Sequence, residues 1–307
     1  MTLISLLLVF VLEQTRPLPS NNAVQSMIAG YFDNMASQFN AGERRQGVMA
    51  WVLAVIPIVI GVALVYSLLC MASSLLALAL NVAALYLMMG FRQISGRFND
   101  IMNALRNDDV DAARETLAGW RNQPAEALDP VEIAKLAMEE GLLSAQRHVF
   151  GIMFWFVVLP GPSGAVLYWL AGMLSDRWGR RGGEENIDFG SFARKAFQVL
   201  DWIPSRLTAI TFAIVGDFQG AIDCWRTQSN SWGNVQQGIV LSAGAGALGV
   251  RLGEAVHENG SMVFRPELGL GEEADVNHMA NGIGLVWRSV LIWLGLIALV
   301  TFVTWFD

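Results

Sequence analysis

The stretch QGVMAWVLAVIPIVIGVALVYSLLCMASSLLALALNVAALYLMMGF, residues 46–91, decides the fold of this chain, because its 46 residues include no Asp, Glu, Lys, Arg or His. A bilayer hydrocarbon core about 30 Å thick is crossed by roughly 20 apolar helical residues. The stretch therefore predicts two crossings, Val48–Leu69 and Ser73–Gly90, joined by a turn at Cys70–Ala72. Backbone groups in lipid must be satisfied within the segment, so both crossings are expected to be helical.

The composition agrees with a membrane protein. The chain is 54% hydrophobic and 15% charged and contains 11 Trp, which is typical of the membrane class. Its net charge of −7 comes without a concentrated basic segment, which argues against nucleic acid as a partner. The 2 cysteines and 3 histidines form no ligand motif, so no metal site is predicted from them.

Three further apolar segments are expected to enter the membrane. Met1–Leu12 lacks both a preceding basic residue and a following cleavage site, so it is interpreted as a retained N-terminal helix. Gly284–Phe306 is long enough for a last crossing. His148–Ser175 carries the sequence PGPSG (160–164) at its middle. It is either a single span or a helical hairpin with PGPSG at its apex, sheltered by other protein.

The polar stretch at 91–147 predicts a small helical subdomain. Arg106–Trp120 reads as an exposed helix, with Asn107 or Asp108 as its cap. Asp129-Pro130 begins a second helix that runs to about Ser144, because Asp is a favoured N-cap and Pro a favoured first helical residue.

The following segments are more apolar. Phe192–Gly216 predicts a helix broken at Pro204. The small residues SAGAGALG (242–249) predict close helix packing, since a phosphate loop would need a Lys and a Ser or Thr that are absent here. Val256–Ala280 is acidic and punctuated by glycine, and we expect a mobile cytoplasmic loop there.

Together these segments predict an all-α, polytopic helical integral membrane protein with an inserted cytoplasmic helical subdomain. Lys and Arg at 13–47 and 91–147 place the large loops in the cytoplasm, at the inner membrane. A single span over 148–175 would put the basic residues of 177–195 on the other side, so the same rule favours the hairpin interpretation. The expected parts are an N-terminal membrane helix and hairpin at 1–90, the cytoplasmic subdomain at 91–147, a membrane-embedded core at 148–250, an acidic loop at 251–282 and a C-terminal transmembrane helix at 283–307.

Arg206 is the most informative single charge. It follows Pro204 in an otherwise apolar helix, where an unpaired charge is costly. One interpretation is a structural ion pair with Asp201 or with an acid of another helix. The other is an anion or phosphate site, because Arg binds oxyanions in a bidentate manner.

Four segments together resemble one family. They are Asp201-Trp-Ile-Pro-Ser-Arg-Leu-Thr208, the helix Asn107–Trp120, the block Ala137–Trp155 and Gly246-Ala-Leu-Gly-Val-Arg-Leu-Gly253. They are similar, in this order over most of the chain, to segments of the cobalamin-biosynthesis CobD/CbiB family. The beta-lactam-signalling AmpE proteins look similar too.

The resemblance implies an inner-membrane enzyme. Family members attach aminopropanol or its phosphate to adenosylcobyric acid through an amide bond. The resemblance implies Glu139 and Asp201 as catalytic residues and Arg206 and Thr208 as ligand- or phosphate-binding residues. The cofactors stay open, because ATP and Mg²⁺ are implied only if this amide-ligase activity is retained.

The chain departs from the family pattern at several acids. Leu143, Ser144 and Arg147 stand where the family has Glu, Asn and Asp, while Glu139 remains. Phe197 and Gln198 stand where it has a pair of Asp residues, and the segment Gly172–Arg177 replaces another polar motif. Carboxylates that would hold a cation and its bound phosphates are therefore lost, which disfavours amide ligation.

Two classes of function consequently stay open. The first is an adenosylcobinamide-type amide ligase that uses Glu139, Asp201 and Arg206. The second is a noncatalytic, AmpE-like membrane sensor or signalling modulator. The expected partners are the lipid bilayer, a corrinoid or another anionic small molecule, and a second copy or a membrane protein. Transport is a poorer third class, since intramembrane ionisable residues are few and no repeated halves are seen.

The charge distribution predicts that the segment 177–195 lies in the cytoplasm and that the turn at Cys70 faces the opposite side. A cysteine introduced at position 180 should therefore react with an impermeant maleimide only after the cells are opened. The native Cys70 serves as the outward-facing reference. Labelling of position 180 in intact cells would contradict the hairpin interpretation of 148–175.

Overall fold

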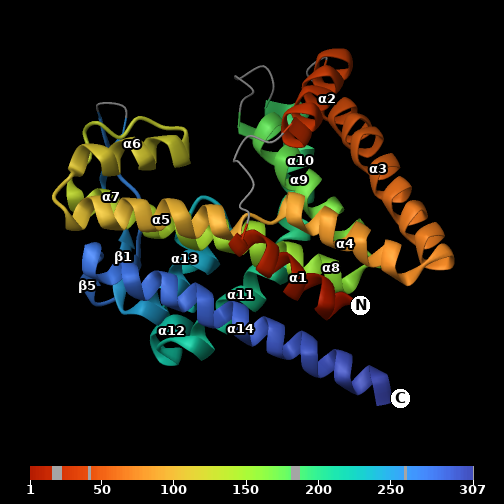
Figure 1. Ribbon diagram of the computed structural model, residues 1–307. Coiled ribbons are helices and arrows are strands. Elements are labelled where there is room, and N and C mark those ends of the chain that lie inside the picture. Colours follow the sequence, from red (N-terminus) through yellow and green to blue (C-terminus); the bar gives the residue numbers. More distant parts are fainter. Residues whose placement is uncertain (16–22, 41–42, 181–186, 259–260, 307) are drawn as a thin grey trace. The chain divides into compact units, whose positions relative to one another are not determined.

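The computed structural model describes residues 1–15, 23–40, 43–180, 187–258 and 261–306 (Figure 1). The predicted all-α class is confirmed. Within these residues, 4 helices are long and apolar enough to cross a membrane: Arg44–Ala72, Ser74–Arg106, Pro130–Val158 and Val276–Val303. The chain forms two compact units, which are described separately below. The first contains Met1–Gly90 and Arg147–Trp202, and the second contains Phe91–Gln146 and Ile203–Asp307.

The first unit is helical. Its helices are α1 (Thr2–Thr15), α2 (Ala23–Phe39), α3 (Arg44–Ala72), α4 (Ser74–Met88), α8 (Gly151–Val158), α9 (Ser163–Arg180) and α10 (Ile187–Leu200), and a π-helical turn, η1 (Gln146–Phe150), precedes α8.

The predicted transmembrane hairpin is α3 and α4. The turn lies at Ser73, one residue beyond the predicted Cys70–Ala72, and the Ser73 hydroxyl accepts a hydrogen bond from the Leu75 amide at 3.3 Å. Many of the large apolar side chains of α3 are exposed, as expected for a helix that faces lipid. Pro57 lies inside α3.

The segment around PGPSG also forms a hairpin, as predicted. A Cβ added at Gly164 would lie 2.0 Å from the carbonyl oxygen of Trp155, and one added at Gly151 would lie 2.3 Å from the ring of Tyr168. These contacts join the end of α8 to the start of α9 and the start of α8 to the middle of α9, so the two helices pack antiparallel. Its depth in the membrane stays a prediction.

The second unit combines helices with short strands. Its helices are α5 (Phe91–Arg106), α6 (Val110–Arg121), α7 (Pro130–Ala145), α11 (Trp202–Val215), α12 (Phe218–Gln228), α13 (Val235–Leu248) and α14 (Val276–Phe306), with a 3₁₀ turn, η3 (Ser229–Ser231). Its strands are β1 (Val250–Gly253), β2 (Val256–Glu258), β3 (Ser261–Val263), β4 (Glu267–Gly269) and β5 (Glu272–Glu273).

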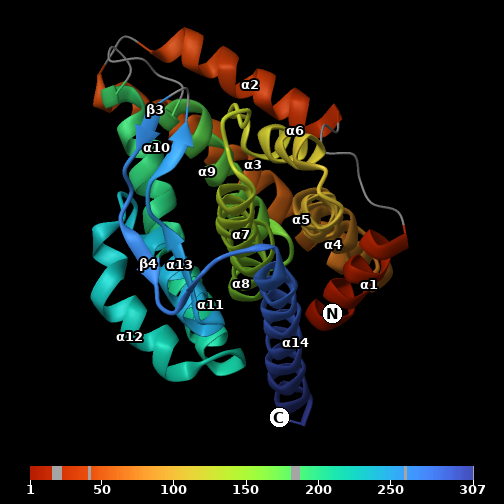
Figure 2. The ribbon, with the colours of Figure 1, turned by 90° about the vertical axis from the view of Figure 1, so that its left-hand side faces the viewer.

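These strands replace much of the acidic loop that the sequence predicts at 251–282. Strand β1 pairs antiparallel with β4 and parallel with β5, and β2 and β3 form a separate antiparallel pair. Strand β4 packs on α13 (Figure 2). The pattern was missed because strands of two to four residues are too short to show an alternation of apolar and polar positions.

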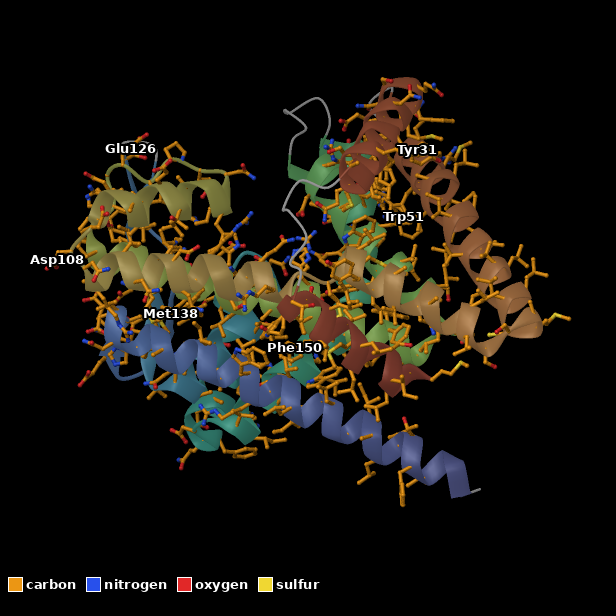
Figure 3. All side chains as sticks on the ribbon, viewed as in Figure 1. Tyr31, Trp51, Asp108, Glu126, Met138 and Phe150 are labelled. Carbon is orange, nitrogen blue, oxygen red and sulfur yellow. The ribbon has the colours of Figure 1, made fainter. Side chains whose placement is uncertain are left out.

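Of the two predicted helix caps, one is confirmed and one is wrong. Asp129 caps α7, and Glu132 completes a capping box with it. For α6 the predicted caps, Asn107 and Asp108, are wrong: the cap is Asp109, whose carboxylate accepts a hydrogen bond from the Ala112 amide at 3.1 Å. Figure 3 shows Asp108 at the outer edge of this unit.

The predicted break at Pro204 lies at Asp201 instead. Helix α10 ends at Leu200 and α11 begins at Trp202, so Pro204 falls in the first turn of α11, where its missing N–H is not needed. The predicted close packing around 242–249 is confirmed, because a Cβ at Gly246 would lie 2.3 Å from the Gly220 carbonyl oxygen of α12.

Asp275 precedes α14 and caps it. Its carboxylate accepts hydrogen bonds from the amides of Asn277 and His278 at 2.8 and 3.1 Å. Partial burial raises the pKa of Asp275, but hydrogen bonds from His278 and Asn277 outweigh burial and lower it overall.

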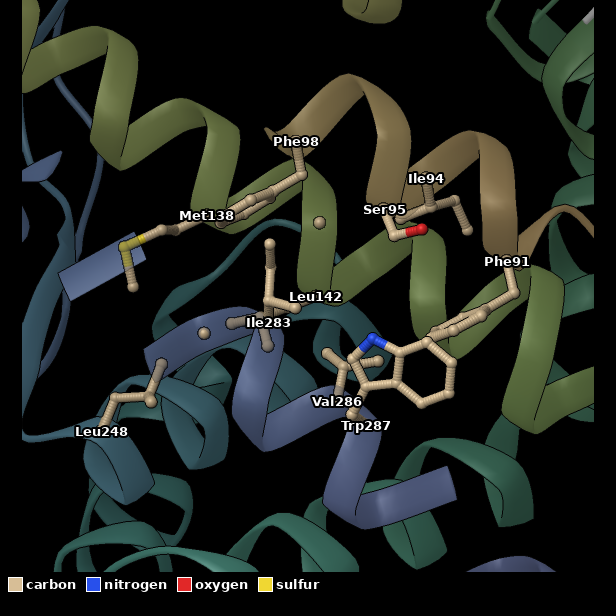
Figure 4. A pocket seen from close by; sticks show the side chains of 12 residues that line it. Phe91, Ile94, Ser95, Phe98, Met138, Leu142, Leu248, Ile283, Val286 and Trp287 are labelled. Atoms are coloured by element: carbon tan, nitrogen blue, oxygen red, sulfur yellow. The ribbon is translucent and has the colours of Figure 1, made fainter. Parts of the chain in front are cut away.

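An apolar pocket of ≈ 30 Å³ lies between α5, α7 and α14, with Leu248 of α13 at its side (Figure 4). Phe98 and Met138 lie toward one end, and Phe91 and Trp287 form the other, where their rings meet edge to face with centroids 4.5 Å apart.

Gly282 and Gly141, which both line this pocket, allow a matched test of its packing. A Cβ at Gly282 would lie 3.7 Å from Met138 and Phe98, in ordinary contact, whereas one at Gly141 would lie 2.9 Å from the Phe98 ring. We expect Gly282→Ala to stabilise the protein by about 0.5–1 kcal/mol through helix propensity. Gly141→Ala should destabilise it by about 1–3 kcal/mol through overpacking. Denaturant unfolding in detergent measures both, and equal effects would contradict this account.

Candidate functional site

Arg147 lies at the centre of a polar cluster in the first unit. The η1 turn carries Arg147, α9 carries Gly172 and Asp176, and α10 carries Phe197. The guanidinium donates to Asp176 Oδ1 at 3.1 Å and to the Gly172 carbonyl oxygen at 2.5 Å, and its Nη2 lies 2.6 Å from Asp176 Oδ2. It also lies over the Phe197 ring, 4.9 Å from the centroid. We call these four residues the Arg147 cluster.

The Arg147 cluster gathers positions from three separate sequence segments. Arg147 and Phe197 stand where the resemblance places acids, and Gly172 and Asp176 lie in the segment that replaces a polar motif. A bidentate Arg–carboxylate pair with a stacked ring is a well-defined arrangement. A divalent cation does not fit beside it, because the guanidinium would repel the cation and both oxygens of Asp176 already contact that guanidinium.

A small polar pocket adjoins the cluster. It has a volume of ≈ 60 Å³ and is lined by Arg147, His148, Tyr168, Trp169, Gly172, Met173 and Asp176. Such a volume holds a few water molecules or one small polar group. Helical segments of π type occur frequently at functional sites, which suits a pocket beside η1.

Asp201 is buried in the same unit. Its Oδ1 accepts a hydrogen bond from the Tyr168 hydroxyl at 2.6 Å, and Tyr168 is only 1% exposed. The ring of Tyr168 packs against Phe197, with centroids 5.2 Å apart. Tyr168 therefore touches both the predicted catalytic acid and the Arg147 cluster.

Glu139, the other predicted catalytic residue, lies in the second unit. Arg265 binds it in a bidentate manner, at 2.7 Å to Oε2 and 3.1 Å to Oε1. The Gly253 amide donates to Oε1 at 2.9 Å. The Glu139 side chain is 7% exposed and that of Arg265 is 14% exposed, so this is a buried, fully engaged carboxylate.

Glu139 belongs to a row of charged residues on one face of α7. Glu132, Lys135 and Glu139 are spaced three and four residues apart, which places them on the same side of the helix. Each pairs with the strand region: Glu132 with His257 at 2.9 Å, Lys135 with Glu254 at 2.5 Å and Glu273 at 3.1 Å, and Glu139 with Arg265. We call this the α7 ion-pair row.

Arg206 and Thr208, the predicted ligand-binding residues, both lie on α11 of the second unit. Arg206 is half-buried. Thr208 is fully buried, and its hydroxyl has no hydrogen-bond partner within the described part of the chain. Because Asp201 belongs to the first unit, the predicted Asp201–Arg206 pair stays a prediction, as does the joint action of the four site residues.

Sequence reasoning missed the partners of these residues. Arg265 lay in the expected acidic loop, and Tyr168 lay in an apolar helix. Glu132, Lys135 and Glu139 are charged residues spaced three and four apart, and this spacing could have predicted the α7 ion-pair row. Nothing in the sequence pointed to Arg265, which is 126 residues away from Glu139.

The buried Glu139–Arg265 pair makes a quantitative prediction. Arg265→Met leaves Glu139 charged and buried, so we expect a loss of about 3–5 kcal/mol in unfolding free energy. The double variant Glu139→Gln/Arg265→Met should recover part of that loss. Denaturant unfolding in detergent measures both. Asp111→Ala, which removes an exposed i,i+3 pair with Arg114, should cause no measurable change. A single variant as stable as the double would show that the pair is not buried as described.

Comparisons with known proteins place the chain in a family. The family model described as "CobD/Cbib protein" matches residues 3–286. A protein of Stutzerimonas stutzeri named "Cobalamin biosynthesis protein CobD" is 34% identical over 92% of this chain and 90% of its own length. One of the same name from Chromobacterium violaceum is 36% identical over 72% of this chain and 70% of its own. No solved structure matches. The chain therefore belongs to the CobD/CbiB family.

Proposed function

We propose that this protein belongs to cobalamin biosynthesis at the membrane, in the part of the pathway where aminopropanol or its phosphate is attached to adenosylcobyric acid. The similarity to relatives named for cobalamin biosynthesis supports the pathway. Within that part of the pathway, we propose that the protein binds an anionic pathway compound and that its amide-forming activity is weak or absent. The observation that carries this second part is the Arg147 cluster.

The chemistry of the cluster favours an anion. A guanidinium presents a planar fork of donors that matches carboxylate or phosphate, and Arg147 lines the ≈ 60 Å³ pocket. An anionic group that entered this pocket would share the guanidinium with Asp176. A divalent cation would meet a positive charge instead, so no step through a bound Mg²⁺ is derived for this chain.

A second candidate is the noncatalytic, AmpE-like sensor or modulator. The engagement of Glu139 favours it, because both oxygens of that acid are held by Arg265 and the Gly253 amide. Freeing Glu139 for acid–base work would leave Arg265 buried without its partner, at a cost of several kcal/mol. As a sensor or modulator, the protein would bind a ligand or a partner protein at the pocket without converting a substrate.

We propose an inner-membrane location with the large loops in the cytoplasm. The 4 candidate crossing helices support a lipid bilayer as partner. The distribution of Lys and Arg in the loops supports their placement on the cytoplasmic side. A corrinoid ligand and a homo-oligomer or membrane-protein partner belong to the same proposal.

The two candidates differ in one assay. Purified protein is given adenosylcobyric acid, aminopropanol phosphate, ATP and Mg²⁺, and both the amide product and the binding of adenosylcobyric acid are measured. We expect binding with little or no product, and no rescue of a strain that lacks the authentic synthase. Abundant product would establish the ligase and exclude the modulator. Neither binding nor product would leave the modulator and overturn the pathway assignment.

The same binding measurement tests the role of Arg147. Arg147→Met should weaken binding at least tenfold, because a charge-assisted hydrogen bond contributes about 1.5–3 kcal/mol. Arg177→Met is the matched control, since Arg177 pairs with Asp33 on another surface of the same unit. Equal effects of the two variants would show that Arg147 does not contact the ligand.

A further inference from the structure

One side of α11 presents apolar side chains to the outside. Ile203, Leu207, Ile210 and Ile214 are 43%, 36%, 40% and 58% exposed. Their spacing of four, three and four residues places them on a single face of the helix. A contiguous exposed apolar face of this kind marks an interaction surface. We call these four residues the α11 stripe.

A hydrogen bond gives the depth of α11 relative to α14. Trp293 donates from Nε1 to the hydroxyl of Thr211 at 3.1 Å. Trp293 lies inside Val276–Val303, one of the helices able to cross the membrane. Thr211 therefore lies at the level of a residue within that span, and the α11 stripe lies on the same helix as Thr211. Where α14 crosses the bilayer, we therefore expect the stripe to meet the same hydrocarbon.

The length of α11 excludes a full crossing. Its 14 residues extend about 21 Å, short of the roughly 30 Å of the hydrocarbon core. The chain leaves the helix at Gly216 and Asp217, which are both exposed. We expect this end of α11 at the membrane surface, because a charge and irregular backbone are costly deeper in the bilayer. The Asp217 amide donates to the Ala247 carbonyl oxygen of α13 at 3.0 Å.

We propose that α11 is a membrane-embedded half-span whose α11 stripe contacts lipid acyl chains, in addition to the four helices that can cross. The rest of α11 is largely buried, and its buried residues include Phe212 as well as the hydroxyl-bearing Ser205, Thr208 and Thr211. Lipid contact on one side and hydroxyls on the other explains why this short helix can carry polar groups at membrane depth. The proposal does not depend on the proposed function.

Spin-label accessibility tests the proposal on the full chain in lipid nanodiscs. Cys70 and Cys224 are first replaced by Ser and Ala. Leu207→Cys, Ile210→Cys and Ile214→Cys are then labelled one at a time, so that the result does not rest on one variant that folds poorly. Asp223→Cys is the control, because Asp223 is exposed on the polar surface of α12.

We expect labels on the stripe to be relaxed by oxygen, which partitions into lipid, and shielded from a water-soluble nickel chelate. The oxygen-to-nickel ratio should be several-fold higher than at the Asp223 control. Access of the nickel chelate to the stripe would overturn the proposal, since the stripe would then face water. Shielding from both reagents would overturn it as well, because the stripe would then be covered by protein.

Discussion

The cost of burying an unpaired charge is the constraint on which this structure depends. Charged residues make up 15% of the chain, and several ionic groups that enter the interior meet a partner of opposite charge. Glu139 meets Arg265, Lys135 meets Glu254 and Glu273, and Arg147 meets Asp176. Removing one member of such a pair lowers the stability far more than replacing both members by well-packed apolar residues. These pairs therefore fix which surfaces of the helices and strands must face one another within each unit.

The features that were predicted from the sequence are local ones. The absence of charge over 46–91 predicts a membrane hairpin, and the PGPSG apex predicts a second hairpin, because both depend on contiguous residues. The capping box of α7 is likewise encoded within four residues. The five short strands were missed because they are stabilised by pairing, and β1 and β4 also by packing on α13, not by any periodicity of their own. The helix boundary predicted at Pro204 was wrong because proline is permitted in the first turn of a helix.

For the candidate site as well, local features were predictable from the sequence and long-range contacts were not. Arg206 was singled out as a charge in an apolar helix, and the family resemblance added Glu139, Asp201 and Thr208; neither argument says what these residues touch. Their partners come from elsewhere in the chain: Arg265 for Glu139 and Tyr168 for Asp201. Long-range pairs of this kind leave no trace in local spacing. The environment of each acid, and hence what it can do chemically, had to come from the structure.

At the Arg147 cluster, the charge of one side chain decides which kind of ligand the surrounding helices could hold. An acid at position 147 would add negative charge beside Asp176 and Asp201, and a site of that kind attracts cations. Arginine at the same position cancels the charge of Asp176 and lines a small pocket. The packing partners of this position, Gly172 and Phe197, suit a flat guanidinium, since one accepts its hydrogen bond and the other stacks on it. A change of charge sign at one helix turn, supported by its neighbours, thus replaces an arrangement that would repel an anion with one in which the charges of Arg147 and Asp176 balance.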